Sequence, residues 1–214
     1  MEKSPSPDIV VTGYSARYAA EVRKLLVREG GFVDDPADRG GTTSFGISLR
    51  FLKAEGAFDE DGDGIADFDL DMDGDIDGQD IRKLTRGDAV YLYHRCFWQT
   101  VRAEDFARPL GEAMFDQAVN GGLGAARKLL QQALNACLEG MRRNDRLTVD
   151  GQIGAATMAA YQVVLTYPAF GMPVLISAYR KAAADRYRAI VARYPSQKRF
   201  LTGWLNRARG LGAS

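Results

Sequence analysis

Apolar residues recur at helical spacing along most of the chain. In the first such stretch, from about Ser15 to Arg28, apolar side chains lie on one face at the spacing i, i+4, i+7 and i+8. They are Tyr18, Val22, Leu25 and Leu26. Gly30 and Gly31 follow, and glycine at this point is typical of a helix end. We therefore predict a helix whose last turn contains Glu29.

Later stretches have the same period. The motif Thr85-x-x-Asp88 has the pattern of a capping box, which predicts a helix N-terminus, and apolar positions continue beyond it at helical spacing. Residues 123–138 and 173–194 repeat that spacing, and a short helix follows them. The run from Phe45 to Leu52 is too brief to separate a strand from the start of a helix. The pattern predicts a mainly α-helical fold with a short β or loop segment.

Membrane-spanning and secretory segments are not visible in the sequence. The longest apolar run, about Tyr161 to Met172, is interrupted by polar residues, proline and glycine, and is shorter than the ~20 residues that cross a bilayer. The N-terminus has no basic start followed by an apolar block, as a signal peptide requires. We expect a protein made in the cytoplasm without a signal peptide.

Composition and charge narrow the class further. The chain has 214 residues, 46% of them hydrophobic, and a formal net charge of zero, which suits a globular protein with one substantial core. From Glu55 to Asp80 there are twelve acidic residues and no Lys or Arg, so the remaining chain carries a net charge of plus twelve. A basic surface suits anionic partners. No zinc-finger spacing or RNA-binding signature supports nucleic acid as the partner.

The chain has one histidine and two cysteines, which limits the catalytic and metal-binding chemistry open to it. His94 is the only histidine, which leaves no His-rich zinc site and favours carboxylate chemistry. Cys96 and Cys137 fall on apolar faces of predicted helices. They fit either two buried free thiols or a mutual disulfide, because the sequence does not give their separation. Aromatic residues at helical spacing usually serve packing, so we expect Trp98 in the core rather than as a platform for sugar.

The acidic segment has the spacing of a calcium-binding EF-hand loop. Counted from Asp69, acids occupy positions 1, 3, 5, 7, 9 and 12, namely Asp69, Asp71, Asp73, Asp75, Asp77 and Asp80. Such a loop needs several oxygen ligands, a glycine at position 6, a backbone carbonyl at position 7 and an apolar residue at position 8. Gly74 and Ile76 supply the glycine and the apolar residue. A solvated acidic loop is the alternative, but the spacing predicts a structural Ca²⁺. Asp80 is shorter than the usual Glu at position 12.

A second acidic group precedes this loop. Asp59, Asp61, Asp63 and Asp67 resemble the calcium repeats of thrombospondin type 3. Position 12 counted from Asp59 is Leu70, so this segment is not a full EF-hand. A second calcium ion is left open.

Residues Glu29 to Ile47 carry the candidate catalytic chemistry. Partial negative charge at a helix C-terminus disfavours ionisation of a carboxyl, and a glycosidase acid must hold its proton near neutral pH. Asp38 precedes a glycine pair that can turn the chain and return a second carboxylate toward Glu29. Taken singly, Glu29 also fits a solvated helix end, Asp38 a turn residue and Thr43 a cap.

The same stretch resembles the N-terminal motif of glycoside hydrolase family 108, the secretion-activator and phage-type N-acetylmuramidases. The matching positions are Glu29, Gly30, Gly31, Phe32, Asp35, Pro36, Asp38, Gly40, Gly41, Thr43, Phe45, Gly46 and Ile47. The spacing is also similar to the Glu, Asp and Thr triad of short phage lysozymes. The resemblance implies a lysozyme-like helical fold in which Glu29 is the general acid. Asp38 and Thr43 would then position the hydrolytic water or stabilise charge on the sugar. The acidic insert departs from the family pattern.

The second half resembles the centre of the same family and its predicted peptidoglycan-binding region. By that resemblance Asp116, Gln117 and Asn120 are candidate substrate-binding residues, together with Phe45 of the first motif. Capping of the next helix is an equally simple role for Asn120. The run from Asp150 to Thr157 is similar to a turn of peptidoglycan-binding modules, and it predicts a turn that leads into a helix.

We divide the chain into three parts. Residues 1–14 are predicted to form a flexible N-terminal arm, and 15–110 a catalytic lysozyme-like lobe that includes the acidic insert at 57–80. Residues 111–214 are predicted to form a helical lobe with the peptidoglycan-binding-like region.

The resemblance implies an endolysin-type peptidoglycan hydrolase. It would cleave the β-1,4 bond between N-acetylmuramic acid and N-acetylglucosamine, and the distance between the carboxyls would decide the stereochemistry. A lytic transglycosylase using the same Glu is one alternative, and a non-catalytic, calcium-dependent wall-binding protein is another. We expect a monomer that reaches the cell wall, in the periplasm or outside the cell, by holin-like or other non-classical export. Stable insertion into a membrane is not expected.

Overall fold

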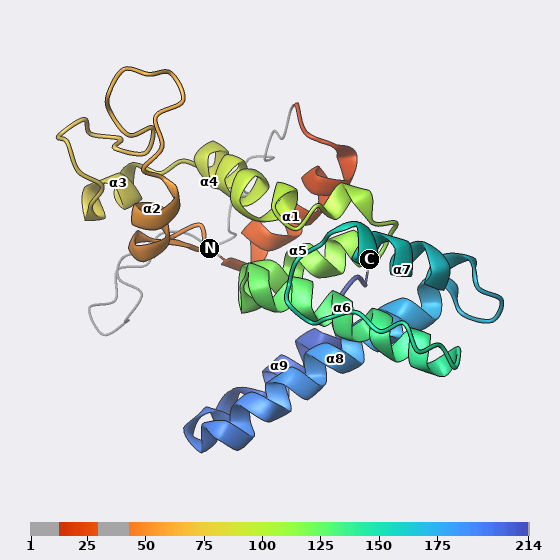
Figure 1. Ribbon diagram of the computed structural model, residues 1–214. Helices are drawn as coiled ribbons and strands as arrows, with labels where there is room; N and C mark the ends of the chain where they lie inside the picture. The colour runs from red at the N-terminus through yellow and green to blue at the C-terminus, as the bar shows by residue number, and fades with distance from the viewer. Residues whose placement is uncertain (1–12, 30–42, 214) are drawn as a thin grey trace, which may run out of the picture. The chain divides into compact units, whose positions relative to one another are not determined.

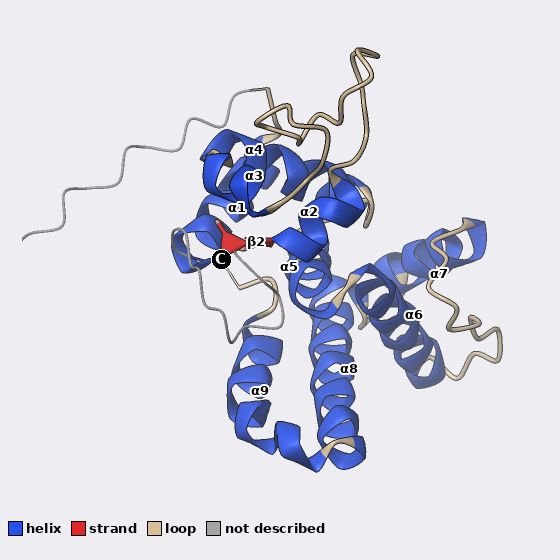
Figure 2. Cartoon of the chain, turned by 90° about the vertical axis from the view of Figure 1, so that its left-hand side faces the viewer, coloured by secondary structure: helices blue, strands red, loops and turns tan. Residues whose placement is uncertain are grey.

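The computed structural model describes residues 13–29 and 43–213, and the fold is mainly helical (Figures 1 and 2). The helical class predicted from the sequence is therefore confirmed. The chain divides into two compact units, Met1–Cys96 and Phe97–Ser214. The first is called unit 1 below and the second unit 2.

Unit 1 contains helices of moderate length and one small antiparallel hairpin. Its elements are α1 (Ala16–Glu29), β1 (Thr43–Ser44), β2 (Ile47–Ser48), α2 (Leu49–Glu55), α3 (Gly78–Lys83) and α4 (Arg86–Tyr93), with the π-helical segment η1 (His94–Gln99) continuing beyond its end. The predicted N-terminal arm lies outside the described residues except for Gly13 and Tyr14.

Helix α1 forms where the apolar spacing predicts it. The hydroxyl of Ser15 accepts a hydrogen bond from the backbone N–H of Tyr18 at 3.1 Å, which satisfies one of the free donors of the first turn. Its predicted apolar face is buried. The Tyr18 hydroxyl also donates to the carbonyl of Val90 in α4. The rings of Tyr14 and Tyr18 pack edge-on against His94, with centroids 4.7 and 4.8 Å away. The only histidine is therefore part of an aromatic cluster that joins α1 to the end of α4.

The segment from Phe45 to Leu52 contains both structures that its sequence left open. Ile47 and Ser48 form strand β2, and α2 begins directly afterwards at Leu49. The Ser48 hydroxyl accepts from the N–H of Phe51 at 3.2 Å and caps that helix. One residue therefore ends the strand and starts the helix.

The capping box predicted at Thr85 is confirmed. The Thr85 hydroxyl accepts from the N–H of Asp88 at 3.2 Å, and the Asp88 carboxylate accepts from the N–H of Thr85 at 2.7 Å. These two reciprocal bonds begin α4 at Arg86.

Aromatic contacts attach the acidic insert to α4 and the segment that follows it. The ring of Phe58 lies 5.7 Å from that of Phe68 and 6.2 Å from that of Tyr91. The guanidinium of Arg95 lies over the Phe58 ring at 3.8 Å and pairs with Glu60. The insert is thus held to the rest of unit 1 by packing as well as by its own backbone bonds.

Unit 2 is built from longer helices. Its elements are η2 (Ala103–Asp105), α5 (Leu110–Gly121), α6 (Leu123–Gly140), α7 (Ala155–Thr166), α8 (Gly171–Arg193), η3 (Pro195–Phe200) and α9 (Leu201–Gly210). Helices α8 and α9 lie side by side as a hairpin (Figure 2), and the rings of Tyr187 and Trp204 stack between them at 5.3 Å.

Trp98 lies in the core of unit 2, as its helical spacing predicts. Its side chain is 1% exposed, its indole N–H donates to Glu104 at 3.1 Å, and its ring packs edge-on against Phe115 at 5.3 Å. A buried indole with a satisfied donor is a packing residue rather than a sugar platform.

The turn before α7 is held by one buried side chain. The amide of Gln131 in α6 donates to the Asp150 carboxylate at 2.7 Å and to the Gln152 carbonyl at 3.0 Å, and it accepts from the N–H of Gly151 at 2.7 Å. Gly151 has φ of +85°, a conformation that glycine adopts without strain. The predicted turn leading into a helix is confirmed.

Both cysteines are free and buried. Of the two alternatives that the sequence left open, the structure therefore contains free thiols at Cys96 and Cys137. Within residues 13–29 and 43–213, every helix is too short or too polar to cross a membrane.

Candidate active site

Glu29 is the last residue of α1, the position that its sequence predicts. Its side chain lies outside what the structure describes, and so do residues 30–42 with the second predicted carboxylate, Asp38. The remaining predicted catalytic residue, Thr43, starts β1. The structure therefore places the two ends of the predicted motif, a helix C-terminus and a β-hairpin.

The hairpin that follows Thr43 has a two-residue turn. Thr43 pairs with Ser48, and Ser44 pairs with Ile47. The two turn residues, Phe45 and Gly46, have φ of +50° and +79°. Positive φ at both positions is the arrangement whose twist matches that of the flanking strands, and it favours glycine or asparagine.

Phe45 is strained in this turn, because a side chain with a Cβ rarely adopts positive φ. Its backbone is held by the hydroxyl of Tyr93, which donates to the Phe45 carbonyl at 3.1 Å. The guanidinium of Arg86 lies over the half-buried ring at 5.8 Å. Strained residues that surrounding contacts hold in place often belong to functional sites. The substrate-binding role of Phe45 stays a prediction. The sequence did not single out Tyr93 or Arg86 for this role, since both act from α4 over a long sequence separation.

The other predicted substrate-binding residues lie on α5 in unit 2. Arg207 of α9 binds the carboxylate of Asp116 through two nitrogens, at 2.8 and 2.6 Å. Gln117 is 1% exposed, and its side-chain oxygen accepts from the hydroxyl of Tyr187 at 3.2 Å. Asp116 and Gln117 are thus both fixed by partners from the C-terminal hairpin.

Asn120 does not cap the following helix, so that alternative from the sequence is wrong. Gly122 precedes α6 and makes no side-chain cap. The Asn120 amide instead donates back to Asp116, at 2.8 Å to its carbonyl and 3.1 Å to its carboxylate. The exposed Asn120 and the half-buried Asp116 therefore form one polar cluster on α5.

The predicted EF-hand loop brings three of its six acids together. Asp69, Asp71 and Asp73, at positions 1, 3 and 5, have carboxylate oxygens within 4.8 Å of one another. Gly74 at position 6 has φ of +97°, the bend that this position requires. Ile76 at position 8 is buried, as expected for the residue that attaches the loop to the core.

The other three acids of the loop are outside that group. Asp75 is exposed, and Asp77 caps α3 by accepting from the N–H of Gln79 at 2.5 Å. Asp80 is fully buried, and its two oxygens accept from the N–H groups of Leu70 and Asp77, each at 2.6 Å. Asp80 therefore closes the loop, and each of its oxygens keeps a lone pair beyond these bonds.

The first acidic segment repeats the hydrogen bonding of the second. In each loop the carboxylate at position 1 accepts from the N–H groups at positions 5 and 6. For Asp59 the donors are Asp63 at 3.2 Å and Gly64 at 2.9 Å. For Asp69 the donors are the corresponding residues Asp73 at 3.2 Å and Gly74 at 2.8 Å.

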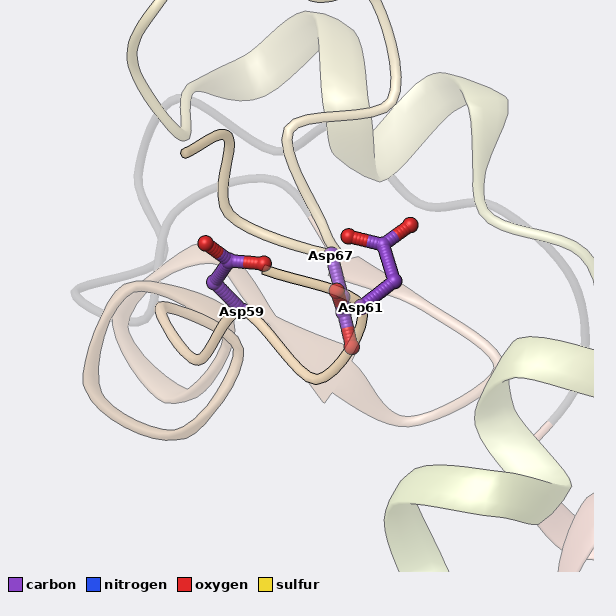
Figure 3. A group of neighbouring side chains, drawn as sticks. All are labelled: Asp59, Asp61 and Asp67. Carbon is purple, nitrogen blue, oxygen red and sulfur yellow. The ribbon is translucent and has the colours of Figure 1, made fainter. Parts of the chain in front are cut away.

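In the first loop Asp59, Asp61 and Asp67 have carboxylate oxygens within 4.8 Å of one another (Figure 3). Asp63 is outside this group, and its carboxylate accepts from the N–H of Ile65 at 2.8 Å. The sequence alone did not indicate that the two segments share a backbone geometry.

Electrostatics differ between the loops. Desolvation raises the pKa of the Asp71 carboxyl, and the charges of Asp73 and Asp80 raise it further. One Asp71 oxygen is buried without a hydrogen-bond partner. In the first loop the N–H of Gly64 instead lowers the pKa of Asp59. The second loop thus carries crowded negative charge that a cation would neutralise.

The second loop is linked to the β1–β2 hairpin through α3. This helix begins directly after the second loop and contains the buried residues Asp80 and Ile81. It contacts β1, the strand that starts with Thr43. A well-ordered second loop therefore helps to fix the position of Thr43 within unit 1.

Comparison with known proteins identifies the class of this chain. Residues 22–122 match the model of Glycosyl hydrolase 108, and residues 125–209 match that of the Predicted Peptidoglycan domain. The helical fold, the motif around Glu29 and these matches define a glycoside hydrolase that acts on peptidoglycan. Residues 22–122 are thus similar to the glycosyl hydrolase 108 family, and residues 125–209 are similar to a peptidoglycan domain.

A solved structure supports the fold. The structure of SagA from Brucella abortus is 21% identical in sequence and superposes with a TM-score of 0.61, covering 92% of this chain and 97% of that one. At 21% sequence identity, this similarity is evidence for a shared fold alone. No curated protein matches the sequence significantly.

Proposed function

We propose that this peptidoglycan hydrolase cleaves the β-1,4 bond between N-acetylmuramic acid and N-acetylglucosamine, with Glu29 as the general acid. The observation that carries the proposal is that α1 ends at Glu29, within the family match and next to the predicted motif. A proton held on this carboxyl would pass to the glycosidic oxygen as the bond to the leaving sugar breaks. Asp38 and Thr43 would then assist water attack or stabilise the oxocarbenium-like state.

Thr43 and Phe45 support a substrate site at the hairpin. Thr43 lies in a short strand of fixed register, and Phe45 is held in a strained turn by Tyr93. Such positioning reduces the freedom lost when a sugar binds. Asp116 and Asn120 of α5 are proposed further contacts to the glycan. Gln117, which is buried, would act by orienting this part of α5.

The chemical product tests this proposal. Wild type and Glu29→Gln are incubated with purified peptidoglycan, and the soluble fragments are analysed by mass spectrometry. We expect wild type to clear the suspension and to release fragments with reducing ends, while the variant leaves the suspension turbid. Fragments with 1,6-anhydro-muramyl ends would instead identify a lytic transglycosylase that uses the same Glu without water. Sedimentation of both proteins with the wall, without clearing by either, would identify a binding protein.

We also propose that the acidic insert binds structural calcium. The second loop is the stronger site, because it combines the EF-hand spacing with a gathered carboxylate group at Asp69, Asp71 and Asp73. Asp80 and the backbone carbonyl of Asp75 are proposed further ligands, with Asp77 placed at the position that often binds through water. The repeated bonding of the first loop supports a second ion at Asp59, Asp61 and Asp67.

Calcium titration with matched variants tests the metal proposal. Calcium binding to wild type, Asp69→Asn and Asp75→Asn is measured by isothermal titration calorimetry. Each variant removes one negative charge from the same loop, so a difference between them reports ligation of calcium by the side chain rather than the charge of the loop. We expect Asp69→Asn to lose binding at the second loop and Asp75→Asn to retain it, because position 7 binds through its carbonyl. Equal loss in both variants would point to a diffuse acidic surface.

A further inference from the structure

A surface groove in unit 2 is lined by residues that play no part in the sites described above. It runs between α6 and α8, which pack against each other (Figure 1), and has a volume of about 560 Å³. Grooves that hold small ligands are typically ~300–1,000 Å³. The groove is thus large enough for a ligand of several residues or sugar rings.

The walls of the groove are apolar and short. Ala125 and Ala136 line it from α6, and Ala178, Ala182 and Ala189 line it from α8. In each helix these alanines are spaced so that they share one face. Because an alanine side chain ends at its methyl group, the two helices leave an open trough where larger residues would have filled the space.

The length of the trough suits a short extended peptide. The wall on α8 runs from Ala178 to Ala189, a difference of eleven residues, which corresponds to ~16 Å at 1.5 Å per residue. An extended peptide advances ~3.3–3.6 Å per residue, so four or five residues would fill this length.

The rim carries both charges with an excess of positive charge. Lys128, Lys181 and Arg186 face a single acid, Asp185, giving three positive charges and one negative. Asp185 pairs with Lys181 at 2.6 Å and also with Arg188 at 2.8 Å, and all three side chains are exposed. Exposed ion pairs of this kind contribute little to stability. Lys181 and Asp185 can therefore each pair with a charged group of a ligand instead.

We propose that this groove binds the short peptides of peptidoglycan. The inference rests on the proposed function, since it takes peptidoglycan as the substrate, and it adds which part of that polymer unit 2 recognises. Alanine methyl groups of the peptide would lie against the apolar walls. Its carboxylates would pair with Lys128 and Arg186, and an amine would pair with Asp185. Both helices lie within the matched peptidoglycan domain, residues 125–209.

Four variants of the full chain test the groove. Lys128→Glu reverses a charge on the rim, and Ala189→Trp fills one end of the trough at an exposed position. The controls are Lys198→Glu and Ala192→Trp, which make the same changes at exposed positions outside the groove lining. Binding is measured with a free tetrapeptide of wall composition, with intact peptidoglycan, and with glycan strands stripped of peptide by an amidase. Circular dichroism checks that each variant is folded.

We expect wild type to bind the tetrapeptide and to bind intact wall at least tenfold better than stripped glycan. Each groove variant should weaken peptide binding about tenfold or more, while the controls bind as wild type does. Equal binding to intact wall and stripped glycan would overturn the proposal, as would groove variants that bind the tetrapeptide normally.

Cleavage of the stripped glycan separates this inference from the proposed catalysis. Release of reducing ends from stripped strands reports the chemistry at Glu29 and should be unchanged in the groove variants. Peptide binding without cleavage would leave the groove assigned and reject the catalytic proposal. Cleavage without peptide binding would support the catalytic proposal and reject the groove as the peptide site.

Discussion

Removal of calcium should destabilise unit 1 and slow hydrolysis. The carboxylates of Asp69, Asp71 and Asp73 lie within 4.8 Å of one another, and an oxygen of Asp71 is buried without a partner. Without a cation, like charges at this spacing repel one another. The loop leads into α3, which contacts β1, so a disordered loop would also release the strand that carries Thr43.

Mass action sets the size of the effect. At free calcium 100 times Kd, binding to the folded state alone stabilises it by ~2.7 kcal/mol. If all 214 residues unfold together, at ~2–4 °C per kcal/mol, the melting temperature should rise by ~5–11 °C. If unit 1, Met1–Cys96, unfolds by itself, at ~4–8 °C per kcal/mol, the rise should be ~11–22 °C.

Differential scanning calorimetry with saturating calcium or with EGTA measures the shift, and turbidity clearing under the same conditions measures hydrolysis. Magnesium at the same concentration is the ionic-strength control, because it requires near-octahedral geometry and dehydrates reluctantly. Asp75→Asn should keep most of the shift, and Asp69→Asn should lose it. The reasoning is refuted if wild type melts at the same temperature in calcium and in EGTA, or if Asp69→Asn responds to calcium as wild type does.

Further expected outcomes concern the two buried thiols, Gln131 with its partner Asp150, and Tyr93. Burial raises the pKa of both Cys96 and Cys137 to about 11, so a thiol reagent at pH 8 should modify neither in the native protein and both in guanidinium. Gln131→Leu leaves the N–H of the following turn unpaired and should lower the free energy of unfolding, measured in urea, by at least about 2 kcal/mol. The hydrogen bond from Gln131 also lowers the folded-state pKa of Asp150. The Asp150 carboxylate therefore stabilises the fold at pH values above its unfolded pKa, and this stabilisation is lost as the pH falls through its folded pKa. Urea midpoints measured across this pH range should show the loss. Tyr93→Phe removes the bond that holds the strained hairpin turn and should cost about 1 kcal/mol in the same titration while lowering the rate of wall hydrolysis.

Features set by local sequence were predictable. Helix α1 follows from its apolar spacing and the glycines after it, and α4 follows from the capping box at Thr85, because both signals act within a few residues. The bend at Gly74 was also predictable, since only a glycine adopts that backbone angle without strain.

Features set by distant partners were not predictable. Phe45 is not a residue type that favours positive φ, yet it adopts this conformation. The hydroxyl of Tyr93, from α4, donates a hydrogen bond to the Phe45 carbonyl. Asn120 looked like a cap, but its amide bonds to Asp116, which Arg207 holds from the far end of the sequence. The groove between α6 and α8 likewise depends on which faces of two helices meet, and helical spacing alone does not give that pairing.

The rate at which Glu29→Gln releases reducing ends from purified peptidoglycan tests the central claim most directly. Glu21→Gln is the matched control, since it makes the same change at a half-buried position on α1. General acid catalysis typically contributes ~10²–10⁴-fold, so Glu29→Gln should lose at least about 100-fold in rate, with an unchanged circular dichroism spectrum, while Glu21→Gln stays close to wild type. A Glu29→Gln protein that hydrolyses the wall at a rate comparable to wild type would contradict the assignment of Glu29 as the acid.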